Sequence, residues 1–522
     1  MLQPVVLVFL DGWGLSPTKV GNAIGMAATP FMQYAETHFP SFPLDASGMS
    51  VGLLWGEKGN SEVGHMTVGA GRMVKQPFTR ITNALEDGSF FTNVPLRAAC
   101  LHTQQYNSRL HIIGVYSPGG VHGHMEHIDA MLRMAKAEGV REVYVHLILD
   151  GRDVDPRDAQ RSLASLEAFL TTQGVGTIAT LMGRFYAMDR NQNLERTQSA
   201  YTALREGTEI RFPSWKKALE DAYRKGISDE FMEPVALTDA KGALTPRIND
   251  NDAVIMTNFR ADRIHQLAES LVADPFTGFA RSRLNNCFVV TFTRYAKHLP
   301  VAGIAFPAQE LASTVGQLVE AAGMHQVRIA ESEKAAHVTY FFNGEREEPY
   351  PHEDRVIVPS PITERFERVP EMSGASVTEE VLKALKSNQY QFMVVNYANP
   401  DMLAHTGNLP ATIGAVEFVD RQLAELWDAV RRKNGTLLIT GDHGNAEEMV
   451  NPLNGEVNKD HSINPVPFVI MHNAFLTEKS PAEVISLKAR YEPVGILPDV
   501  SATVLKMLKI PKPSNFIGQA LI

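Results

Sequence analysis

The chain is 522 residues long, which at roughly 150 residues per domain corresponds to two to four domains, or to two large ones. Hydrophobic residues make up 44% and charged residues 21%, proportions that exclude a disordered or fibrous chain and are typical of a soluble globular protein. Asp and Glu (59) outnumber Lys and Arg (49), so the formal charge is −10, which argues against nucleic acid or an anionic membrane as the main partner.

Short apolar, β-branched runs alternate with amphipathic segments along most of the chain. In chain order, the predicted strands are 5–10, 141–149, 252–259, 391–397 and 435–440. The clearest predicted helices are 128–139 and 415–435. Continuous apolar strands between helices are typical of parallel sheets that are covered on both faces, so we expect an α/β fold.

The first ten residues form an apolar run that ends at Asp11. The run is short, lacks a basic segment and has Asp11-Gly12 where a cleavage site is expected, so we interpret it as a strand and not as a signal sequence. No apolar stretch approaches the ~20 residues that span a bilayer. The two cysteines, Cys100 and Cys287, are too few for a disulfide framework and fit a reducing compartment. We therefore expect a cytoplasmic protein.

The two ends of the chain differ in composition from its middle. Asp and His residues that follow strands are concentrated in residues 11–61 and 401–461, and arginine-rich motifs lie between these segments. An insertion into a surface loop of a host domain explains this distribution, because folds tolerate insertions there. We therefore predict a metal-binding domain formed by residues 1–75 and 310–522, with an inserted substrate-binding domain at residues 76–309.

Carboxylates and imidazoles follow three of the predicted strands. The candidate metal ligands are Asp11, Asp401, His405, Asp442, His443 and His461. Because ligands bind outside the carboxyl ends of strands in open α/β sheets, we expect these side chains to meet at one site. Oxygen and imidazole ligands without thiolate suit Mn²⁺, Mg²⁺ or Zn²⁺. The alternative for any single one of these residues is a turn or helix cap, or an ordinary histidine.

The number of candidate ligands exceeds what one divalent ion needs, so we predict two ions. A pair of ions suits phosphoryl transfer, because one can hold the nucleophile while the other holds the phosphate oxygens. A candidate nucleophile is therefore expected in the same part of the chain.

The glycine-rich segment 56–72 contains one well-placed hydroxyl, Ser61. Asn60-Ser61-Glu62 can open a helix, and the N–H groups at a helix start favour a phosphate. A serine is a poor nucleophile unless a base or a metal lowers its pKa. No His/Asp triad spacing accompanies Ser61, so we predict activation by metal; the alternative is a plain helix N-cap.

Arginine-containing motifs in the middle of the chain predict a pocket for an anion. The candidates are Arg152, Arg184, Arg190, Arg260 and Arg263, with His122 as a further substrate contact. Because arginine binds carboxylate and phosphate in bidentate fashion, a small substrate that carries both groups can use several of them. Surface ion pairs are the alternative for any single arginine. His124 and His127 are interpreted as structural.

Two further charged residues are candidates for the chemistry. Asp153, next to Arg152, can act as an acid or base on a substrate hydroxyl. Lys334 follows the second boundary between the predicted domains, so we expect it to face the cleft and to neutralise charge on a transferred phosphoryl group. A solvated surface lysine is the alternative.

Taken together, the motifs closely resemble those of one family. They are LDGWG, GNSEVGHMTVGAGR, LDGRDVDPRDA, GRFYAMDR, NFRADR, RIAESEK, NYANPDMLAHTG, TGDHGNAEEM and NPVPF, in family order from residue 10 to residue 468. This set resembles the cofactor-independent phosphoglycerate mutases. The resemblance implies an alkaline-phosphatase-like core with a parallel-rich sheet and an inserted second α/β domain. It also implies interconversion of 2- and 3-phosphoglycerate, in glycolysis and gluconeogenesis, without a 2,3-bisphosphoglycerate primer.

The same resemblance implies roles for individual residues, motif by motif. It implies two ions, with Mn²⁺ favoured and Mg²⁺, Co²⁺ and Zn²⁺ as alternatives. One ion would be bound by Asp401, His405 and His461, and the other by Asp11, Ser61, Asp442 and His443. Ser61 would be the phosphorylated nucleophile. The substrate-binding residues would be His122, Arg152, Asp153, Arg184, Arg190, Arg260, Arg263 and Lys334. It also suggests a monomer.

Two rival functions stay open at this point. A phosphomonoesterase or another phosphomutase would use the same metal-binding core, although a simple hydrolase has no need for an arginine-rich insert that holds the dephosphorylated product. A non-catalytic metal-binding or scaffold protein is the rival from another class, and the presence of Ser61 beside a complete ligand set argues against it.

Overall fold

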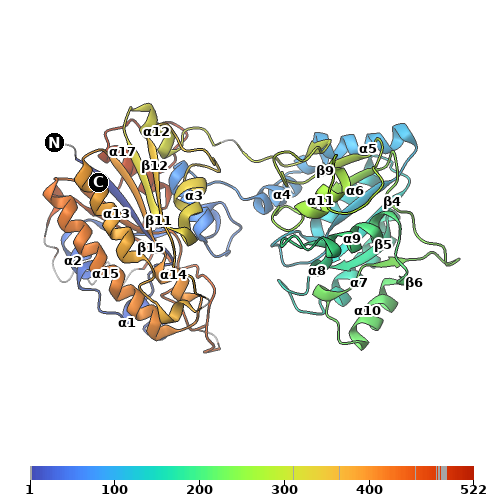
Figure 1. Ribbon diagram of the computed structural model, residues 1–522, viewed down its shortest axis with the longest axis horizontal. Helices are drawn as coiled ribbons and strands as arrows, with labels where there is room; N and C mark the ends of the chain where they lie inside the picture. Colours follow the sequence, from blue (N-terminus) through green and yellow to red (C-terminus); the bar gives the residue numbers. More distant parts are fainter. Residues whose placement is uncertain are drawn as a thin grey trace. The chain divides into compact units, whose positions relative to one another are not determined.

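The computed structural model describes residues 3–522 apart from 310, 364, 453, 478, 480–482 and 484–490. It divides into two compact units, Met1–Gln76 with Glu310–Ile522, and Pro77–Gln309 (Figure 1). Each unit is built on an eight-stranded sheet that is mostly parallel, so the predicted α/β fold class is confirmed. In the described part of the chain, no helix combines the length and the apolar character that crossing a membrane requires.

The sheet of the first unit has the strand order β12-β11-β13-β1-β14-β15-β2-β16. The strands are β1 (Val5–Leu10), β2 (Ser41–Asp45), β11 (Gln326–Glu331), β12 (Glu353–Val358), β13 (Phe392–Tyr397), β14 (Thr436–Gly441), β15 (Val466–Met471) and β16 (Gly495–Ile496). Only β15 pairs antiparallel to its neighbours among these strands. The carboxyl ends of β11, β13, β1 and β14 therefore lie side by side at one edge of the sheet.

Helices cover both faces of this sheet because its central strands are largely apolar on both faces. In β1, Val6, Val8 and Leu10 pack on one face, and the alternate residues pack on the other. The first face is covered by α2 (Pro30–His38), α13 (Gly374–Ser387) and α15 (Leu409–Arg432), and the second by α3 (Ser61–Ala70), α12 (Val315–Ala321) and α17 (Pro498–Met507). Shorter helical segments are α1 (Ala23–Met26), η1 (Gly48–Val51), η4 (Ser332–Lys334), η5 (His337–Phe341), η6 (Phe366–Arg368), α14 (Asn399–Ala404) and η7 (Asn473–Phe475).

The sheet of the second unit has the strand order β10-β9-β8-β3-β4-β5-β7-β6. Its strands are β3 (Leu110–Val115), β4 (Val143–Leu149), β5 (Thr177–Gly183), β6 (Arg211–Phe212), β7 (Val235–Leu237), β8 (Ala253–Met256), β9 (Phe288–Thr291) and β10 (Gly303–Ile304). The four neighbouring strands β8, β3, β4 and β5 are parallel, whereas β7 pairs antiparallel to β5. Their carboxyl ends again share one edge.

Two layers of helices enclose the second sheet. One hydrophobic cluster joins it to α4 (Pro77–Glu86), α5 (Val94–Tyr106), α6 (Met125–Ala137), α7 (Ala159–Gln173) and α10 (Trp215–Arg224). The opposite cluster joins it to α9 (Leu194–Arg205) and α11 (His265–Val272). Short segments are η2 (Ser89–Thr92), α8 (Arg184–Ala187) and η3 (Asp229–Phe231).

The predicted strands are confirmed as β1, β4, β8, β13 and β14, with ends that differ by up to three residues. The predicted helix at 128–139 is α6, which begins three residues earlier. The helix predicted at 415–435 is α15, which begins six residues earlier, at Leu409. Asn408 caps it by accepting a hydrogen bond from the N–H of Ala411 (3.1 Å), and Pro410 stands in its first turn.

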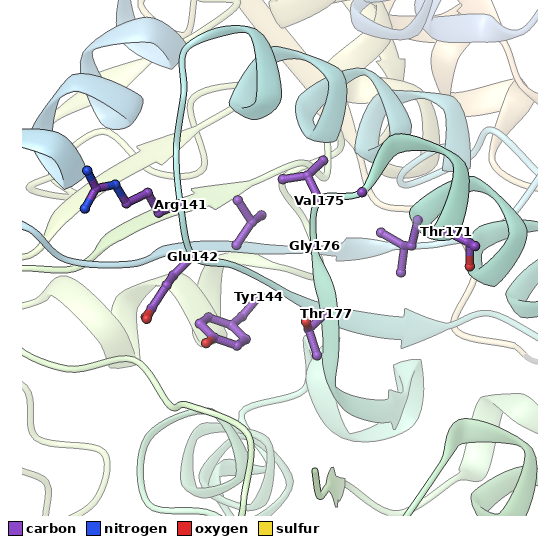
Figure 2. A pocket seen from close by; sticks show the side chains of 10 residues that line it. Arg141, Glu142, Tyr144, Thr171, Val175, Gly176 and Thr177 are labelled. Atoms are coloured by element: carbon purple, nitrogen blue, oxygen red, sulfur yellow. The ribbon is translucent and has the colours of Figure 1, made fainter. Parts of the chain in front are cut away.

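A cavity of about 470 Å³ opens at the amino-terminal ends of β4 and β5 (Figure 2). Arg141, Glu142 and Tyr144 line it where β4 begins, and Val175, Gly176 and Thr177 line it where β5 begins. All the predicted site residues lie in the described part of the chain, and none of them lines this cavity. The cavity is thus at the edge opposite to the one where α/β sheets bind ligands.

Glu331, the last residue of β11, predicts a pH dependence of stability. It is 1% exposed, and one carboxylate oxygen accepts the Ser373 N–H (3.0 Å) while the other has no hydrogen-bond partner among the described residues. Burial raises the pKa of Glu331 from its usual 4.5 to about 7. Between these values the folded chain holds a proton that the unfolded chain has lost. The contribution to stability is therefore full below about pH 4.5 and is lost as the pH rises through about 7.

We expect Glu331→Gln to remove this loss. Between pH 5 and pH 8 the wild type should lose on the order of 2 kcal/mol more stability than the variant does. Urea unfolding at the two pH values measures the difference. Glu425→Gln, on the exposed side of α15, is the control and should follow the wild type. Parallel pH profiles for Glu331→Gln and wild type would contradict the assignment.

Candidate active site

In the first unit, the candidate side chains come from adjacent strand ends. Lys334 follows β11, Asp401 follows β13, Asp11 follows β1 directly, and Asp442 follows β14 directly. These four strands are neighbours in the sheet, so residues up to 431 positions apart in the chain are brought to one place, Asp11 and Asp442 among them (442 − 11). Each of the four side chains is at least 95% buried. Buried charges at this density must compensate one another.

Ser61 lies within this group, at the first position of α3. Its Oγ donates to Asp11 Oδ1 (3.0 Å) and lies 3.0 Å from Nε2 of His443. The cap of α3 is Asn60, whose side chain accepts a hydrogen bond from the N–H of Val63 (3.1 Å). The interpretation of Ser61 as a plain N-cap is therefore wrong, and its hydroxyl is free to face the carboxylates.

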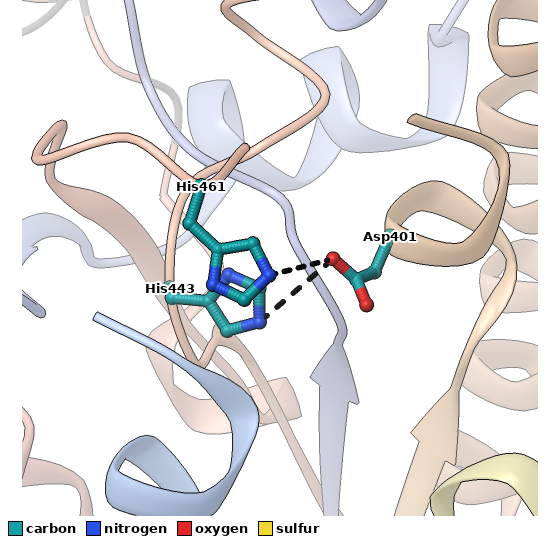
Figure 3. A group of neighbouring side chains, drawn as sticks. All are labelled: Asp401, His443 and His461. Atoms are coloured by element: carbon teal, nitrogen blue, oxygen red, sulfur yellow. Dashed lines mark ion pairs between the residues drawn. The ribbon is translucent and has the colours of Figure 1, made fainter. Parts of the chain in front are cut away.

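Two groups of possible metal ligands lie among the described residues. The first is Asp401, His443 and His461 (Figure 3), and the second is Asp11, His65 and Asp442. In each group, one ligand atom per residue lies within 4.8 Å of the others. His405 adjoins the first group, because its Nε2 is 3.2 Å from Asp401 Oδ1 and 3.2 Å from Nε2 of His461. All six predicted metal ligands thus lie at this one site.

The hydrogen bonds of the histidines show that this group fits a cation. Nδ1 of His405 contacts the carbonyl of Lys459 (2.7 Å), and Nδ1 of His461 contacts the carbonyl of Gly59 (2.8 Å). Because a carbonyl only accepts, each Nδ1 carries the hydrogen, and in the neutral ring each Nε2 presents a lone pair. These lone pairs face each other and the Asp401 carboxylate. Such a set of acceptors repels itself unless a cation or a proton lies between them, and contact with Asp401 accordingly raises the pKa of His405.

His65 is a residue of this site that the sequence interpretation did not single out. Its Nδ1 contacts the carbonyl of Ser61 (2.9 Å) and lies 3.2 Å from Asp442 Oδ2, while Nε2 contacts the side-chain amide of Asn396 (3.1 Å). Since Nδ1 must carry the hydrogen to reach a carbonyl, it donates and does not bind an ion. His65 therefore lies beside the Asp442 carboxylate without a hydrogen bond to its Oδ2. The signal in the sequence was its position four residues after Ser61, on the same side of α3.

Glu447 is a second residue that was not singled out, and it ties the loops of the site together. Its carboxylate accepts the N–H of Gly14 (3.0 Å) and of Asn445 (2.8 Å), and the hydroxyl of Ser462. The loop after Asp11, the loop after Asp442 and the residue beside His461 therefore share one buried anchor. Space around it is so limited that a Cβ on Gly14 would lie 2.3 Å from the Glu447 side chain.

Lys334 is buried, so the interpretation of it as a solvated surface lysine is wrong. Its Nζ donates to Asp11 Oδ1 (2.6 Å), to Asp401 Oδ2 (2.6 Å) and to Ser61 Oγ (2.9 Å). Burial lowers the pKa of Lys334, but Asp11, Asp401 and Asp442 outweigh it and raise the pKa above its usual value. The ammonium group is therefore charged and directed at the serine hydroxyl.

His443 is influenced by the same carboxylates. Burial alone would lower the pKa of His443, but Asp442, Asp11 and Asp401 outweigh burial and raise this pKa to about 10. The three carboxylates are thus opposed by two cationic groups, His443 and Lys334. Conversely, the pKa of Asp401 is well below its usual range, because Lys334 and the neighbouring histidines outweigh its burial.

In the second unit, the predicted substrate-binding residues also follow adjacent strand ends. His122 follows β3, Arg152 and Asp153 follow β4, Arg184 follows β5 directly, and Arg260 and Arg263 follow β8. Because β8, β3, β4 and β5 are neighbours and parallel, these side chains come to one edge of the sheet. Arg190 lies in the loop between α8 and α9.

A cavity of about 350 Å³ at this edge gathers five arginines, and we call it the arginine cradle. They are Arg152, Arg184, Arg190, Arg196 and Arg263. Arg196 was not singled out from the sequence. Its guanidinium lies 3.7 Å from the ring centre of Phe185 and pairs with Asp189 (3.1 Å). Arg260 does not line the cavity and instead lies beside it.

The arginines differ in how they are paired. Arg184 is buried and donates to both Asp150 (2.5 Å) and Asp153. Asp262 pairs with Arg190 and Arg260 (3.3 Å each). The ion pairs that the alternative interpretation expected are therefore present. Arg184 pairs with the candidate Asp153, Asp262 bridges Arg190 and Arg260, and Arg152 pairs with Glu230 (3.4 Å).

The three histidines of the 118–127 segment have different surroundings. His122 lies 3.7 Å from Asp262, and burial together with Arg184 lowers its pKa to about 4, so its ring is neutral near pH 7. His127 is fully buried and packs against Phe259 and Phe292, which agrees with its interpretation as structural. His124 packs against Phe78 and His127.

Two family models match the chain, one for each unit. The model described as the BPG-independent PGAM N-terminus matches residues 81–297, and the model of type I phosphodiesterase / nucleotide pyrophosphatase matches residues 312–499. Among curated proteins, the 2,3-bisphosphoglycerate-independent phosphoglycerate mutase of Chloroflexus aggregans is 43% identical, over all of this chain and 98% of the relative. The chain belongs to the 2,3-bisphosphoglycerate-independent phosphoglycerate mutase family.

Other members of this mutase family are similar over the same extent. The Synechococcus elongatus enzyme of that name is 43% identical, over all of this chain and 96% of its own. A crystal structure of Leishmania mexicana phosphoglycerate mutase at low cobalt concentration has a TM-score of 0.72 and 30% identity, covering 99% of this chain and 97% of the other. The similarity to the mutases therefore extends over both units. The family is metal-dependent and acts on a small-molecule phosphoglycerate.

Proposed function

We propose that this protein interconverts 2-phosphoglycerate and 3-phosphoglycerate through a phosphoserine on Ser61, without a 2,3-bisphosphoglycerate primer. The observation that carries the proposal is the environment of the Ser61 hydroxyl, which contacts Asp11, His443 and Lys334 at 2.9 to 3.0 Å. Membership of the mutase family supplies the substrate class. In this proposal the unit of residues 1–75 and 310–522 is the metal-binding, phosphatase-like domain, and residues 76–309 bind the substrate.

The first step is attack of Ser61 Oγ on the phosphorus of the substrate. Ser61 reacts in its deprotonated form, its proton having passed to solvent. The bond between phosphorus and the serine oxygen forms as the bond between phosphorus and the glycerate oxygen breaks, and the return of the phosphoryl group restores the deprotonated serine. Lys334 donates to Oγ, so its charge stabilises the serine in its deprotonated form and then the transferred phosphoryl oxygens. Ser61 is the first residue of α3, and the N–H groups at a helix start favour a phosphate.

Two divalent ions complete the proposed site, and Mn²⁺ suits its oxygen and imidazole ligands. Asp401, His405 and His461 would hold one ion, and Asp11, Ser61, Asp442 and His443 the other. When bound, such ions lower the pKa of a coordinated hydroxyl and neutralise charge on phosphate oxygens. The lone pairs of His405 and His461 that face Asp401 support the assignment of the first set.

The arginine cradle would retain the glycerate between the two transfers. Arg152, Arg184, Arg190 and Arg263, with Arg260 and His122 beside them, offer bidentate donors to its carboxylate. Asp153 would give a proton to the departing glycerate oxygen and take one from the other hydroxyl before the phosphoryl group returns. Water must be excluded from the phosphoserine while the glycerate is retained, because hydrolysis of the phosphoserine would make the enzyme a phosphatase and not a mutase.

We further propose that the protein is a monomer in a reducing compartment such as the cytoplasm. Cys100 and Cys287 are both free, and neither is fully exposed. Gel filtration with light scattering measures the oligomeric state. A dimer in that measurement would contradict the first part of this proposal.

The proposed function is tested with purified protein, Mn²⁺ and 3-phosphoglycerate alone. We expect ³¹P NMR to show 2-phosphoglycerate forming without added 2,3-bisphosphoglycerate, and inorganic phosphate forming much more slowly. Release of phosphate without the isomer would favour the phosphomonoesterase. Dependence on the bisphosphate primer would contradict the phosphoserine route, because a primer is needed only when the enzyme is not phosphorylated by its own substrate.

A further inference from the structure

One buried carboxylate that the proposed mechanism does not use, Asp150, lies beneath the arginine cradle. It directly follows Leu149, the last residue of β4, and is 5% exposed. Its Oδ1 accepts the N–H of Asp153 (3.1 Å) and of Arg152 (3.3 Å), and it also accepts Nη1 of Arg184 (2.5 Å). A single oxygen therefore contacts three of the predicted substrate-binding residues.

The second oxygen of Asp150 reaches the loop after the neighbouring strand, β3. Oδ2 accepts the hydroxyl of Ser117 (2.9 Å), and Ser117 Oγ accepts the N–H of Gly119 (3.1 Å). Gly119 begins the turn that ends at His122. Loops from β3, β4 and β5 are thus connected through one carboxylate.

The charge of Asp150 matters as much as its geometry. Arg184 is buried, and its guanidinium has two carboxylate partners, Asp150 and Asp153. Without Asp150, Asp153 alone would balance this buried cation. Asp153 is the residue that must exchange a proton with the substrate in the proposed mechanism, so a second carboxylate on Arg184 leaves it available.

We infer that Asp150 is a positioning residue, which holds Arg184, the Arg152-Asp153 turn and, through Ser117, the His122 turn in the arrangement that binds the glycerate. This inference rests on the proposed function. A misplacement of about 1 Å in substrate-positioning groups can cost about 100-fold in rate. The role is therefore visible in kinetics, because Asp150 acts through the residues that it holds.

The experiment compares Asp150→Asn with the matched control Asp158→Asn in the full chain. Asp158 is also buried in the second unit, at the start of α7, where it accepts hydrogen bonds from Arg161 (2.5 Å) and Ser162. We expect Asp150→Asn to lower kcat/KM by about 10- to 100-fold, chiefly through KM, since contacts that persist from the bound substrate to the transition state act on KM. Asp158→Asn should leave kcat/KM within about threefold of wild type.

A double-mutant cycle separates positioning from a general loss of structure. Because Asp150 also holds the Arg152-Asp153 turn and the His122 turn, Asp150→Asn should have an effect on kcat/KM that is smaller by about threefold or more, but not absent, when Arg184 is already alanine. An equal effect in both backgrounds would overturn the inference, as would a wild-type KM for Asp150→Asn. Binding of 3-phosphoglycerate measured by calorimetry gives the same comparison without turnover. A wild type that binds the ligand but does not isomerise it would contradict the proposed function alone.

Ser117→Ala is a second variant that tests the same inference if Asp150→Asn does not fold. This change removes only the hydroxyl between Asp150 and the Gly119 N–H. We expect a loss of about threefold in kcat/KM that disappears when His122 is already alanine. A loss that persists in that background, or no loss at all, would overturn the inference.

Discussion

Replacing Ser61 with alanine is expected to abolish mutase turnover, with a loss of about four orders of magnitude or more. The proposed reaction passes the phosphoryl group to Oγ, and no methyl group can accept it. The fold should persist, because Asn60 and not Ser61 caps α3, and because Lys334 keeps its bonds to Asp11 and Asp401. The lost hydrogen bonds of Ser61 should change stability by only about 1–2 kcal/mol.

Two measurements check this result. Turnover is followed by ³¹P NMR, and phosphoenzyme is trapped by acid quenching after addition of ³²P-labelled substrate. Wild type should carry the label and Ser61→Ala should not. Ser214→Ala, which removes a hydroxyl that caps α10 in the second unit, is the control and should keep both activity and label. Turnover by Ser61→Ala at one hundredth of the wild-type rate or faster would contradict the phosphoserine route.

The residues of the site that could be predicted are those where a charged side chain interrupts an apolar run. Asp11 and Asp442 each end a run of buried apolar residues, and a carboxylate in such a place must be compensated. Parallel strands then bring these residues to the same edge, although they are distant in the chain. Once the apolar runs are interpreted as strands, their positions in the sheet account for most of the candidate metal ligands lying together.

The partners of these residues could not be predicted in the same way. Lys334 contacts Asp11, which lies 323 positions earlier in the chain, and nothing in its local sequence identifies that partner. Glu447 and Asp150 act through bonds to backbone N–H groups, and such bonds depend on loop conformation and not on residue type. His65 and the start of α15 are different. Each carried a local signal that hydrophobic periodicity alone does not reveal. His65 lies four residues after Ser61, and Asn408 with Pro410 marks the start of α15.

Removal of divalent ions is expected to abolish turnover as completely as loss of the serine does, and to lower stability as well. The site holds three aspartates. Lys334 forms ion pairs with two of them, Asp11 and Asp401, at 2.6 Å each. Asp442 Oδ2 has no hydrogen-bond partner among the described residues. An ion at about a thousand times its Kd adds about 4 kcal/mol to the stability of the folded state. Dialysis against chelator should therefore lower the unfolding temperature, and Mn²⁺ should restore it together with activity.

The ligand assignment is tested by counting ions. Elemental analysis should find two per chain in wild type and about one in His405→Ala, because His405 contacts Asp401 and His461 but not the Asp11 group. His472→Ala, which removes a histidine from the cap of η7 in the same unit, should bind two. Affinity should fall in mild acid, since Asp and His bind ions only when deprotonated. A chelated protein shown to contain no ions, yet still fully active, would exclude a metal site at these strand ends from the reaction.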